Sequence, residues 1–258
     1  MKIAVCVKQV PDTNAEKRLT PDWRLDRAGA EQVLNPFDEY AVEEAVRIKE
    51  RLGGQITALS MGPEPAKEAI RRAIAMGCDQ GVLVSDPALA GSDALATALV
   101  LSKALAKLGF DLVLCGQEST DARGGLVPSQ LAEHLDVPQH GYVAKLEFAD
   151  GTVTSHRQVP GGYAVVQSRL PAVVSVVKAI NEPRYPTLPR IMQAKRAQIA
   201  VWSLADLGVA PAAVGAAGAR TRVLGATPAK PRGAAQIHVD KGDAAAVIAD
   251  FLAERRLI

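Results

Sequence analysis

The residues best suited to chemistry lie in one loop, residues 116–130, which contains the pair Gly124-Gly125. Glycine tolerates positive φ angles and lets a ligand approach the backbone closely. A predicted helix follows, and Pro128 suits its first turn because no backbone donor is needed there. The free N–H groups and the dipole of a helix N-terminus favour a phosphate, to which Arg123 could add a charge-assisted hydrogen bond. The loop therefore suggests an anion site, although a glycine pair before a helix more often only joins a strand to a helix.

Three other segments, residues 8–13, 35–38 and 61–63, would meet this loop in an open parallel sheet. Ligands of such sheets bind beyond the carboxyl ends of the strands. Asn35 or Asp38 is suited to cap a helix, and the Phe37 ring is either core or a stacking surface. Neither G-x-x-x-x-G-K-[ST] nor G-x-G-x-x-G after the first strand is present, which disfavours a Walker-type ATPase and a standard NAD-binding enzyme.

No recognisable catalytic set accompanies this predicted pocket. The four histidines are scattered without metal-ligand spacing, and the three cysteines form no C-x-x-C pair. A net charge of +2 favours neither nucleic acid nor a membrane surface. No apolar run is long enough to span a bilayer, and the N-terminus runs directly into a strand without a signal-peptide pattern. We therefore expect a cytoplasmic protein without direct membrane insertion.

The elements that must position these loops alternate between strands and helices, a rhythm typical of right-handed βαβ units and a parallel sheet. Turn signals at 149–151 and 160–162 predict an antiparallel β meander over 142–170. We predict an α/β nucleotide-binding domain over residues 1–180, with a doubly wound, mostly parallel sheet. The expected strands are 2–7, 55–60, 81–84, 111–115, 142–148, 152–159, 163–170 and 172–177, and the expected helices are 38–52, 64–76, 92–108, capped by Ser92, and 125–135.

Residues 181–200 form a second candidate site of a different kind. Prolines at positions 183, 186 and 189 remove backbone donors and predict an irregular segment. Large apolar side chains lie there beside arginines and a lysine. Such a segment is costly to leave in water unless a partner docks on it. The alternative is a connector that lies on its own domain.

Residues 201–258 cannot build an independent core, because alanine and glycine dominate 209–219. Only residues 242–256 have a helical pattern, with Val247, Ile248, Phe251 and Leu252 on one face. We predict an extended C-terminal arm that ends in a helix docked elsewhere, with an unattached tail as the alternative.

Six stretches of the sequence follow the pattern of a known protein family: residues 5–13, 35–45, 60–63, 75–79, 116–138 and 181–195. In order and spacing they resemble the β subunit of electron transfer flavoprotein. The resemblance implies a Rossmann-like fold of the adenine-nucleotide-binding type, and an obligate heterodimer with an α subunit that carries most of the FAD. It also implies an electron carrier rather than a stand-alone enzyme, serving acyl-CoA and other flavoprotein dehydrogenases in fatty acid oxidation. An electron transfer flavoprotein–quinone oxidoreductase is a further possible partner. The arm, residues 201–258, would wrap the α subunit.

The resemblance also implies roles for individual residues. The β subunit would hold AMP in a structural role, with Phe37 near the flavin of the partner. In the family, the 181–200 segment is a dehydrogenase recognition loop, and Leu188 is at its anchor position. The docking residues would be Tyr185, Leu188, Pro189, Ile191 and Met192. The AMP site would comprise Cys6, Val7, Lys8, Asn35, Pro36, Phe37, Asp38, Met61, Asp121, Arg123, Gly124, Gly125, Leu126, Val127, Pro128, Ser129, Gln130 and Ala132.

Two departures from the family pattern leave alternatives open. Thr13 stands where the family has a flavin-proximal tyrosine, and residues 121–127 differ from the stretch with which electron-bifurcating members bind a second FAD in place of AMP. Residues 7–13 nevertheless resemble that branch. AMP is favoured over FAD. A flavin-independent nucleotide-binding regulatory module is a third alternative, and it leaves residues 181–196 unexplained.

Overall fold

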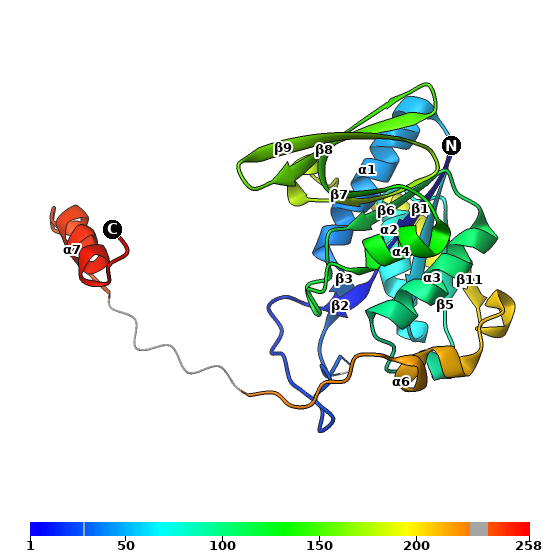
Figure 1. The fold of residues 1–258 in the computed structure, drawn as a ribbon, viewed down its shortest axis with the longest axis horizontal. Coiled ribbons are helices and arrows are strands. Elements are labelled where there is room, and N and C mark those ends of the chain that lie inside the picture. Colours follow the sequence, from blue (N-terminus) through cyan, green and yellow to red (C-terminus); the bar gives the residue numbers. More distant parts are fainter. Residues whose placement is uncertain (28, 228–236) are drawn as a thin grey trace. The chain divides into compact units, whose positions relative to one another are not determined.

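Nine strands form one sheet in the order β11-β5-β4-β1-β6-β10-β7-β8-β9 (Figure 1). The structure is a computed structural model that describes residues 1–27, 29–227 and 237–258. Neighbouring strands from β11 to β7 pair in parallel, whereas β8 and β9 complete an antiparallel meander with β7. The bounds are β1 Lys2–Cys6, β4 Gln55–Met61, β5 Gln80–Val84, β6 Leu112–Gly116, β7 Gln139–Ala149, β8 Thr152–Val159, β9 Gly162–Arg169, β10 Ala172–Val176 and β11 Ile199–Trp202. The predicted α/β class with a mostly parallel sheet is confirmed.

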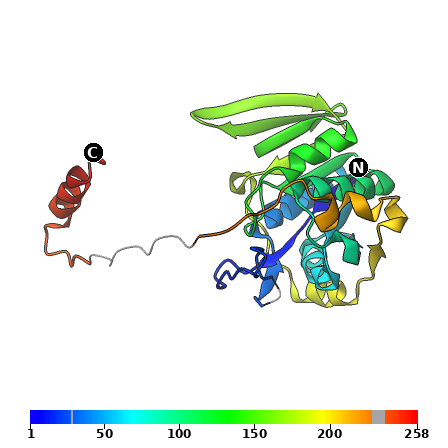
Figure 2. The same cartoon turned by 60° about the horizontal axis from the view of Figure 1, so that its bottom comes forward.

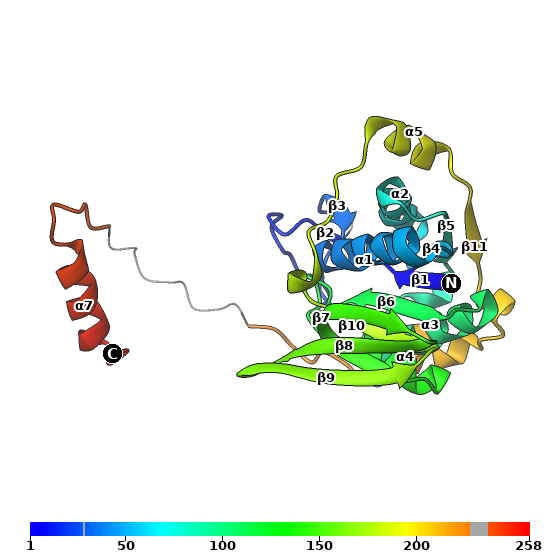
Figure 3. The ribbon, with the colours of Figure 1, turned by 90° about the horizontal axis from the view of Figure 1, so that it is seen from above.

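Helices cover both faces of the sheet, and each face has its own core (Figure 3). Because side chains alternate along a strand, Ile3 and Val5 enter one core while Ala4 enters the other. Helices α1 (Pro36–Leu52) and α2 (Lys67–Met76) pack in the first core, and α3 (Ala94–Leu108) and α4 (Val127–Leu135) pack in the second. Strands β2 (Gln9–Pro11) and β3 (Gln32–Leu34) form a separate antiparallel pair beside the N-terminus of α1.

The meander lies at one edge of the sheet, drawn in green in Figure 2. Its strands follow the expected order, although β7 begins at Gln139, earlier than the expected residue 142. The cause is β10, which pairs with Gln139 and His140 before the meander begins. Helix α3 also differs in detail, because Asp93 rather than Ser92 caps it by accepting from the Ala96 amide.

The segment after β10 contains a helix that the prolines concealed. Residues 188–196 form α5 (Leu188–Arg196), whereas an irregular segment was predicted. Pro189 lies in the first turn, where its missing N–H group is not needed, so it does not prevent the helix. We call residues 181–196 the proline-rich segment. In Figure 3, α5 lies outside α2, which separates it from the sheet.

The C-terminal region departs from the predicted arm in its first part. Residues 199–202 form β11, which returns to the sheet beside β5, and the first compact unit extends from Met1 to Leu224. The remainder, Gly225–Ile258, is a second unit, of which residues 228–236 lie outside the described residues. Helix α7 (Ala244–Glu254) agrees with the predicted helix at 242–256, and its Ile248 and Phe251 side chains are exposed. In the described ranges, no helix is both long and apolar enough to cross a bilayer.

Candidate functional site

The predicted pocket loops converge at the point where the strand order reverses. The chain runs from β1 to β4 and β5 on one side, then returns to β6 on the other side of β1. The carboxyl ends of β1 and β6 therefore face a topological switch point, where doubly wound sheets bind their ligands. Lys8 follows β1, the loop 117–126 follows β6, and α1 begins beside both. Met61, at the carboxyl end of β4, adjoins the same edge.

An ion cluster bridges the switch point. Lys8 Nζ lies 2.8 Å from Asp121 Oδ1 and donates to Ser119 Oγ at 3.2 Å, while Arg27 donates to Asp121 Oδ2 through Nε and Nη2 at 2.9 and 2.7 Å. Burial alone would raise the pKa of Asp121, but the charge and hydrogen bond of Lys8, with bonds from Ser119 and Arg27, hold this pKa at about 2. The carboxylate is thus charged at neutral pH, and two cations share it. That excess of positive charge favours an anionic ligand.

Asn35 ties the start of α1 to the loop after β6. Its Nδ2 donates to the Glu118 carbonyl at 2.9 Å, and its Oδ1 accepts from the Thr120 amide at 3.1 Å. Asn35 occupies the N-cap position of α1, but its side chain makes no cap bond because both polar atoms are used across the switch point. Asn35 is therefore the N-cap residue by position, but the side-chain cap expected of Asn35 or Asp38 is not made.

Asp38 lies beneath these loops and is buried. Its Oδ2 accepts from the Lys8 amide at 2.8 Å. Burial raises the pKa of Asp38 to about 7, against the opposing effects of Asn35 and of the Lys8 and Gly116 backbone. The charge of Asp38 therefore changes near neutral pH.

We expect Asp38→Asn to change how stability depends on pH. Because the folded-state pKa of about 7 exceeds the ordinary 3.8, the folded protein holds more protons than the unfolded chain between these values. This group therefore stabilises fully below pH 3.8, and its contribution is lost as pH rises towards 7. Asparagine cannot titrate, so stability relative to the wild type should rise by up to roughly 1.4 kcal/mol per pH unit inside this window.

Urea unfolding of purified protein at several pH values measures this difference. Asp206→Asn is the matched control, because hydrogen bonds from Ser203 lower the pKa of that exposed carboxyl. This carboxyl titrates below the window, so the stability of Asp206→Asn relative to the wild type should not vary with pH inside it. Parallel pH profiles for the wild type and Asp38→Asn would contradict the assignment.

Helix α4 and its loop supply the other wall. Gly125 has φ +62° and Arg123 has φ +49°, so the backbone here adopts the left-handed region that opens the loop. Val127 begins the helix and Pro128 lies in its first turn, as predicted, so the first-turn N–H groups point out of the helix. The oxygens Thr120 Oγ1, Gln130 Oε1 and Ser60 Oγ are buried and have no hydrogen-bond partner among the described residues.

The structure brings most predicted pocket residues to one edge of the sheet. Ser129, Leu126, Arg123 and Gly124 are exposed, whereas Val7 and Ala132 are buried and can offer only backbone or shape. Cys6, Pro36 and Phe37 are partly buried beside them. Arg27 was missed, because it lies in a long connection with no periodic pattern. Ser119 and Thr120 carried the available signal, since both lie in the loop that the glycine pair singles out.

The proline-rich segment presents apolar side chains to solvent. Tyr185 is 89% exposed, Leu188 72% and Met192 46%. Pro189 is also exposed, but Ile191 is partly buried against the first core. The contacts predicted for this segment are therefore accessible, except that Ile191 faces its own protein.

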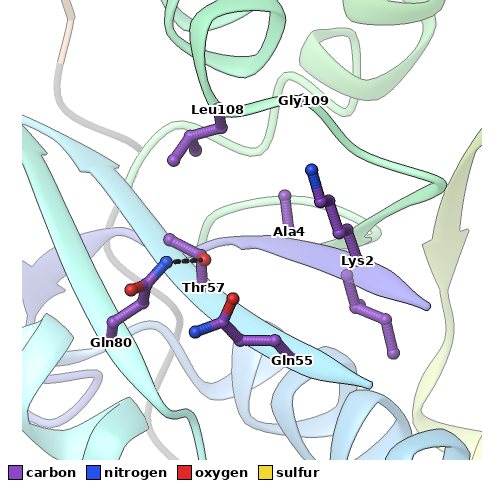
Figure 4. A pocket seen from close by; sticks show the side chains of 8 residues that line it. Lys2, Ala4, Gln55, Thr57, Gln80, Leu108 and Gly109 are labelled. Carbon is purple, nitrogen blue, oxygen red and sulfur yellow. Dashed lines mark hydrogen bonds between the residues drawn. The ribbon is translucent and has the colours of Figure 1, made fainter. Parts of the chain in front are cut away.

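A smaller hollow lies at the opposite edge of the sheet, at the amino ends of β1, β4 and β5 (Figure 4). It has a volume of about 130 Å³, and Gln80 Nε2 donates to Thr57 Oγ1 at 2.8 Å in its wall. Parallel sheets bind ligands at the other edge. The residues that the structure describes bring together no group of three or more His, Cys, Asp or Glu side chains able to hold a metal.

Comparison with known proteins identifies the family. The family model of the electron transfer flavoprotein domain matches residues 22–207. The electron transfer flavoprotein subunit beta of Mycobacterium tuberculosis is 41% identical, over 99% of each chain. That of Clostridium acetobutylicum is 36% identical over 100% of each chain. The Caffeyl-CoA reductase-Etf complex subunit CarD of Acetobacterium woodii is also 36% identical over 100% of each.

A likeness over the whole chain at this identity, joined to the geometry of the sheet and its switch point, leaves one assignment: the chain belongs to the electron transfer flavoprotein β subunit family.

Proposed function

We propose that this chain is the β subunit of a cytoplasmic, heterodimeric electron transfer flavoprotein. It binds AMP structurally, and its proline-rich segment docks flavoprotein dehydrogenases. Electrons pass through the FAD held mainly by the α subunit, and that FAD supplies the redox chemistry when bound. This chain's own residues bind, orient and dock, and it is a carrier subunit rather than an enzyme.

The observation that carries the proposal is the cation-rich switch point. Lys8 and Arg27 outnumber the Asp121 carboxylate that they share, and the loop that carries Asp121 ends at α4, whose first turn has free backbone donors. A dianionic nucleotide phosphate fits this charge and these donors. The buried, unpartnered oxygens of Ser60, Thr120 and Gln130 fit a ligand rich in hydrogen-bonding groups.

Docking is supported by the exposure of Tyr185 and Leu188 on the proline-rich segment. Exposed large apolar groups that gather on one segment are typical of an interaction site. A relative whose printed name joins a CoA-linked reductase to an Etf is consistent with acyl-CoA and other dehydrogenases as partners. A quinone oxidoreductase would accept the electrons, and the exposed apolar face of α7 would cover part of the α subunit.

The alternative is a bifurcating subunit with a second FAD in place of AMP. It is favoured by residues 7–13, whereas residues 121–127 favour AMP. Releasing the bound nucleotides from the purified heterodimer and separating them by chromatography tests both. We expect one AMP and one FAD per heterodimer. Two FAD and no AMP would establish the alternative, and an absence of flavin from the complex would overturn the proposal as a whole.

A further inference from the structure

Helix α5 lies outside α2, and few of its side chains are buried against the rest of the protein. Among its nine residues only Ala194 is buried, and Ile191 is partly buried against the first core. A groove of about 870 Å³ separates α5 from the turn between α2 and β5. Core packing therefore holds only one side of this helix, and polar contacts at its two ends add to its placement.

One anchor lies before α5. The Arg184 guanidinium donates to Glu43 at 2.8 and 3.1 Å and to Glu50 at 2.6 and 3.1 Å, and the Arg184 amide also donates to Glu43. Glu43 is buried on α1, and Arg47 donates to it as well. Burial alone would raise the pKa of Glu43, but the bonds from Arg184 and Arg47 hold it below its usual value. The carboxylate is thus charged at neutral pH and fully engaged.

The same helix holds the chain on the N-terminal side of Arg184. Asn181 Nδ2 donates to the Tyr40 carbonyl at 3.0 Å and to Glu44 at 3.2 Å, and Arg47 reaches the Glu182 carbonyl at 3.3 Å. Several donors and acceptors thus fix residues 181–184 on α1, so the chain that leads to Tyr185 and Leu188 is anchored there.

A second anchor lies at the end of α5. Arg71 of α2 donates through Nη1 to the carbonyls of Ala194, Lys195 and Ala197 at 3.1, 3.0 and 3.3 Å. These carbonyls belong to the last turn and to the C-cap residue Ala197, where a helix lacks internal donors and where a cation is favourable. Arg71 Nε is itself oriented by Glu68 at 3.1 Å.

We propose that Arg184 and Arg71 are positioning residues that hold the proline-rich segment in its docking geometry before a dehydrogenase arrives. The inference rests on the proposed docking function. A segment that is already ordered loses less conformational entropy on binding, so its anchors increase affinity without touching the partner. Their loss should weaken docking and leave the electron-transfer step itself unchanged.

The test uses the heterodimer with Arg184→Gln, Arg71→Gln and the double variant. Arg72→Gln is the matched control, since Arg72 is the next residue on α2 and faces Glu39 at 3.6 Å. Amide hydrogen exchange over residues 187–197 should accelerate about tenfold in the double variant, because two charged anchors are lost. The apparent KM for an acyl-CoA dehydrogenase that reduces the wild type should rise about fivefold, with kcat within about twofold.

The outcomes separate this inference from the docking function. Unchanged amide hydrogen exchange in the double variant would show that Arg184 and Arg71 do not hold the segment in place. Faster exchange with an unchanged KM would overturn their role in docking, and Leu188→Ala would then decide separately whether the segment docks at all. A lowered kcat with a constant KM would also contradict a positioning role. A rise in KM that Arg184→Lys partly reverses, with Arg72→Gln like the wild type, supports it.

Discussion

Replacing Leu188 with alanine should slow electron transfer from a dehydrogenase by about 10- to 100-fold at subsaturating donor concentration. An apolar anchor at the centre of a small interface typically accounts for 2 kcal/mol or more of binding, and about 1.4 kcal/mol corresponds to a factor of ten. Leu188 is 72% exposed, so the truncation removes little from its own fold. The thermal midpoint and the nucleotide content should therefore match those of the wild type.

Leu52→Ala is the matched control for this measurement. Leu52 ends α1, is 50% exposed and lies outside both the proline-rich segment and the switch point. Its variant should transfer electrons at the wild-type rate. Equal rates for Leu188→Ala and Leu52→Ala in stopped-flow reduction by the dehydrogenase would exclude Leu188 as an anchor. Loss of bound nucleotide in Leu188→Ala would point to a structural role instead.

Buried parallel strands were the most predictable part of the fold. Runs such as Ile3 to Val5 and Leu112 to Leu114 are apolar without alternation, because helices cover both faces of the sheet. Strand β11 was not predicted, because it lacks the continuous apolar run of a buried strand. It has four residues, lies at the edge of the sheet, and leaves Ala200 and Val201 exposed. Its short pattern resembles an ordinary exposed connection.

The sequence predicts which loops meet at the candidate site, because the order of the strands decides it. It does not predict which hydrogen bonds the side chains of those loops make. Loops that follow adjacent parallel strands must meet at one edge, so the approach of Lys8 to Asp121 follows from topology. Asn35 is an example. An asparagine before a helix predicts a side-chain cap, but the Asn35 side chain instead donates to the Glu118 carbonyl. Nucleotide binding at this site, and the identity of the nucleotide, stay predictions.

Helix α5 shows a second limit. Prolines exclude a helix only where a backbone donor or the preceding turn is needed, and Pro189 lies where neither is. Its anchors were equally hard to predict, because Arg71 and Arg184 each bind a partner that is more than a hundred residues away in sequence. The residues after Pro189 are mostly good helix formers, so local preference and the tertiary contacts both favour this helix.

Gly116→Ala should destabilise the protein by about 3 kcal/mol, because a methyl group here overpacks a filled core. Gly116 ends β6 directly beneath the first turn of α1. A Cβ atom would lie 2.5 Å from Asp38 Oδ1, and 2.7 and 2.8 Å from the Phe37 carbonyl carbon and oxygen. Backbone cannot yield as a flexible side chain does, so α1 would have to move away from the sheet.

That movement would also open the proposed nucleotide site, since Asn35 and Asp38 hold both sides of the switch point through this turn. Gly124→Ala is the matched control in the same loop, because no atom lies within 4 Å of its would-be Cβ and its φ is not in the left-handed region. Its stability should stay within about 0.5 kcal/mol of the wild type. Urea unfolding of the two variants measures the contrast in stability, and the nucleotide content of Gly116→Ala measures the opening of the proposed site. If Gly116→Ala kept both, the contact between β6 and α1 would not close the pocket; if Gly124→Ala lost nucleotide while remaining stable, its position would instead mark direct contact with the ligand.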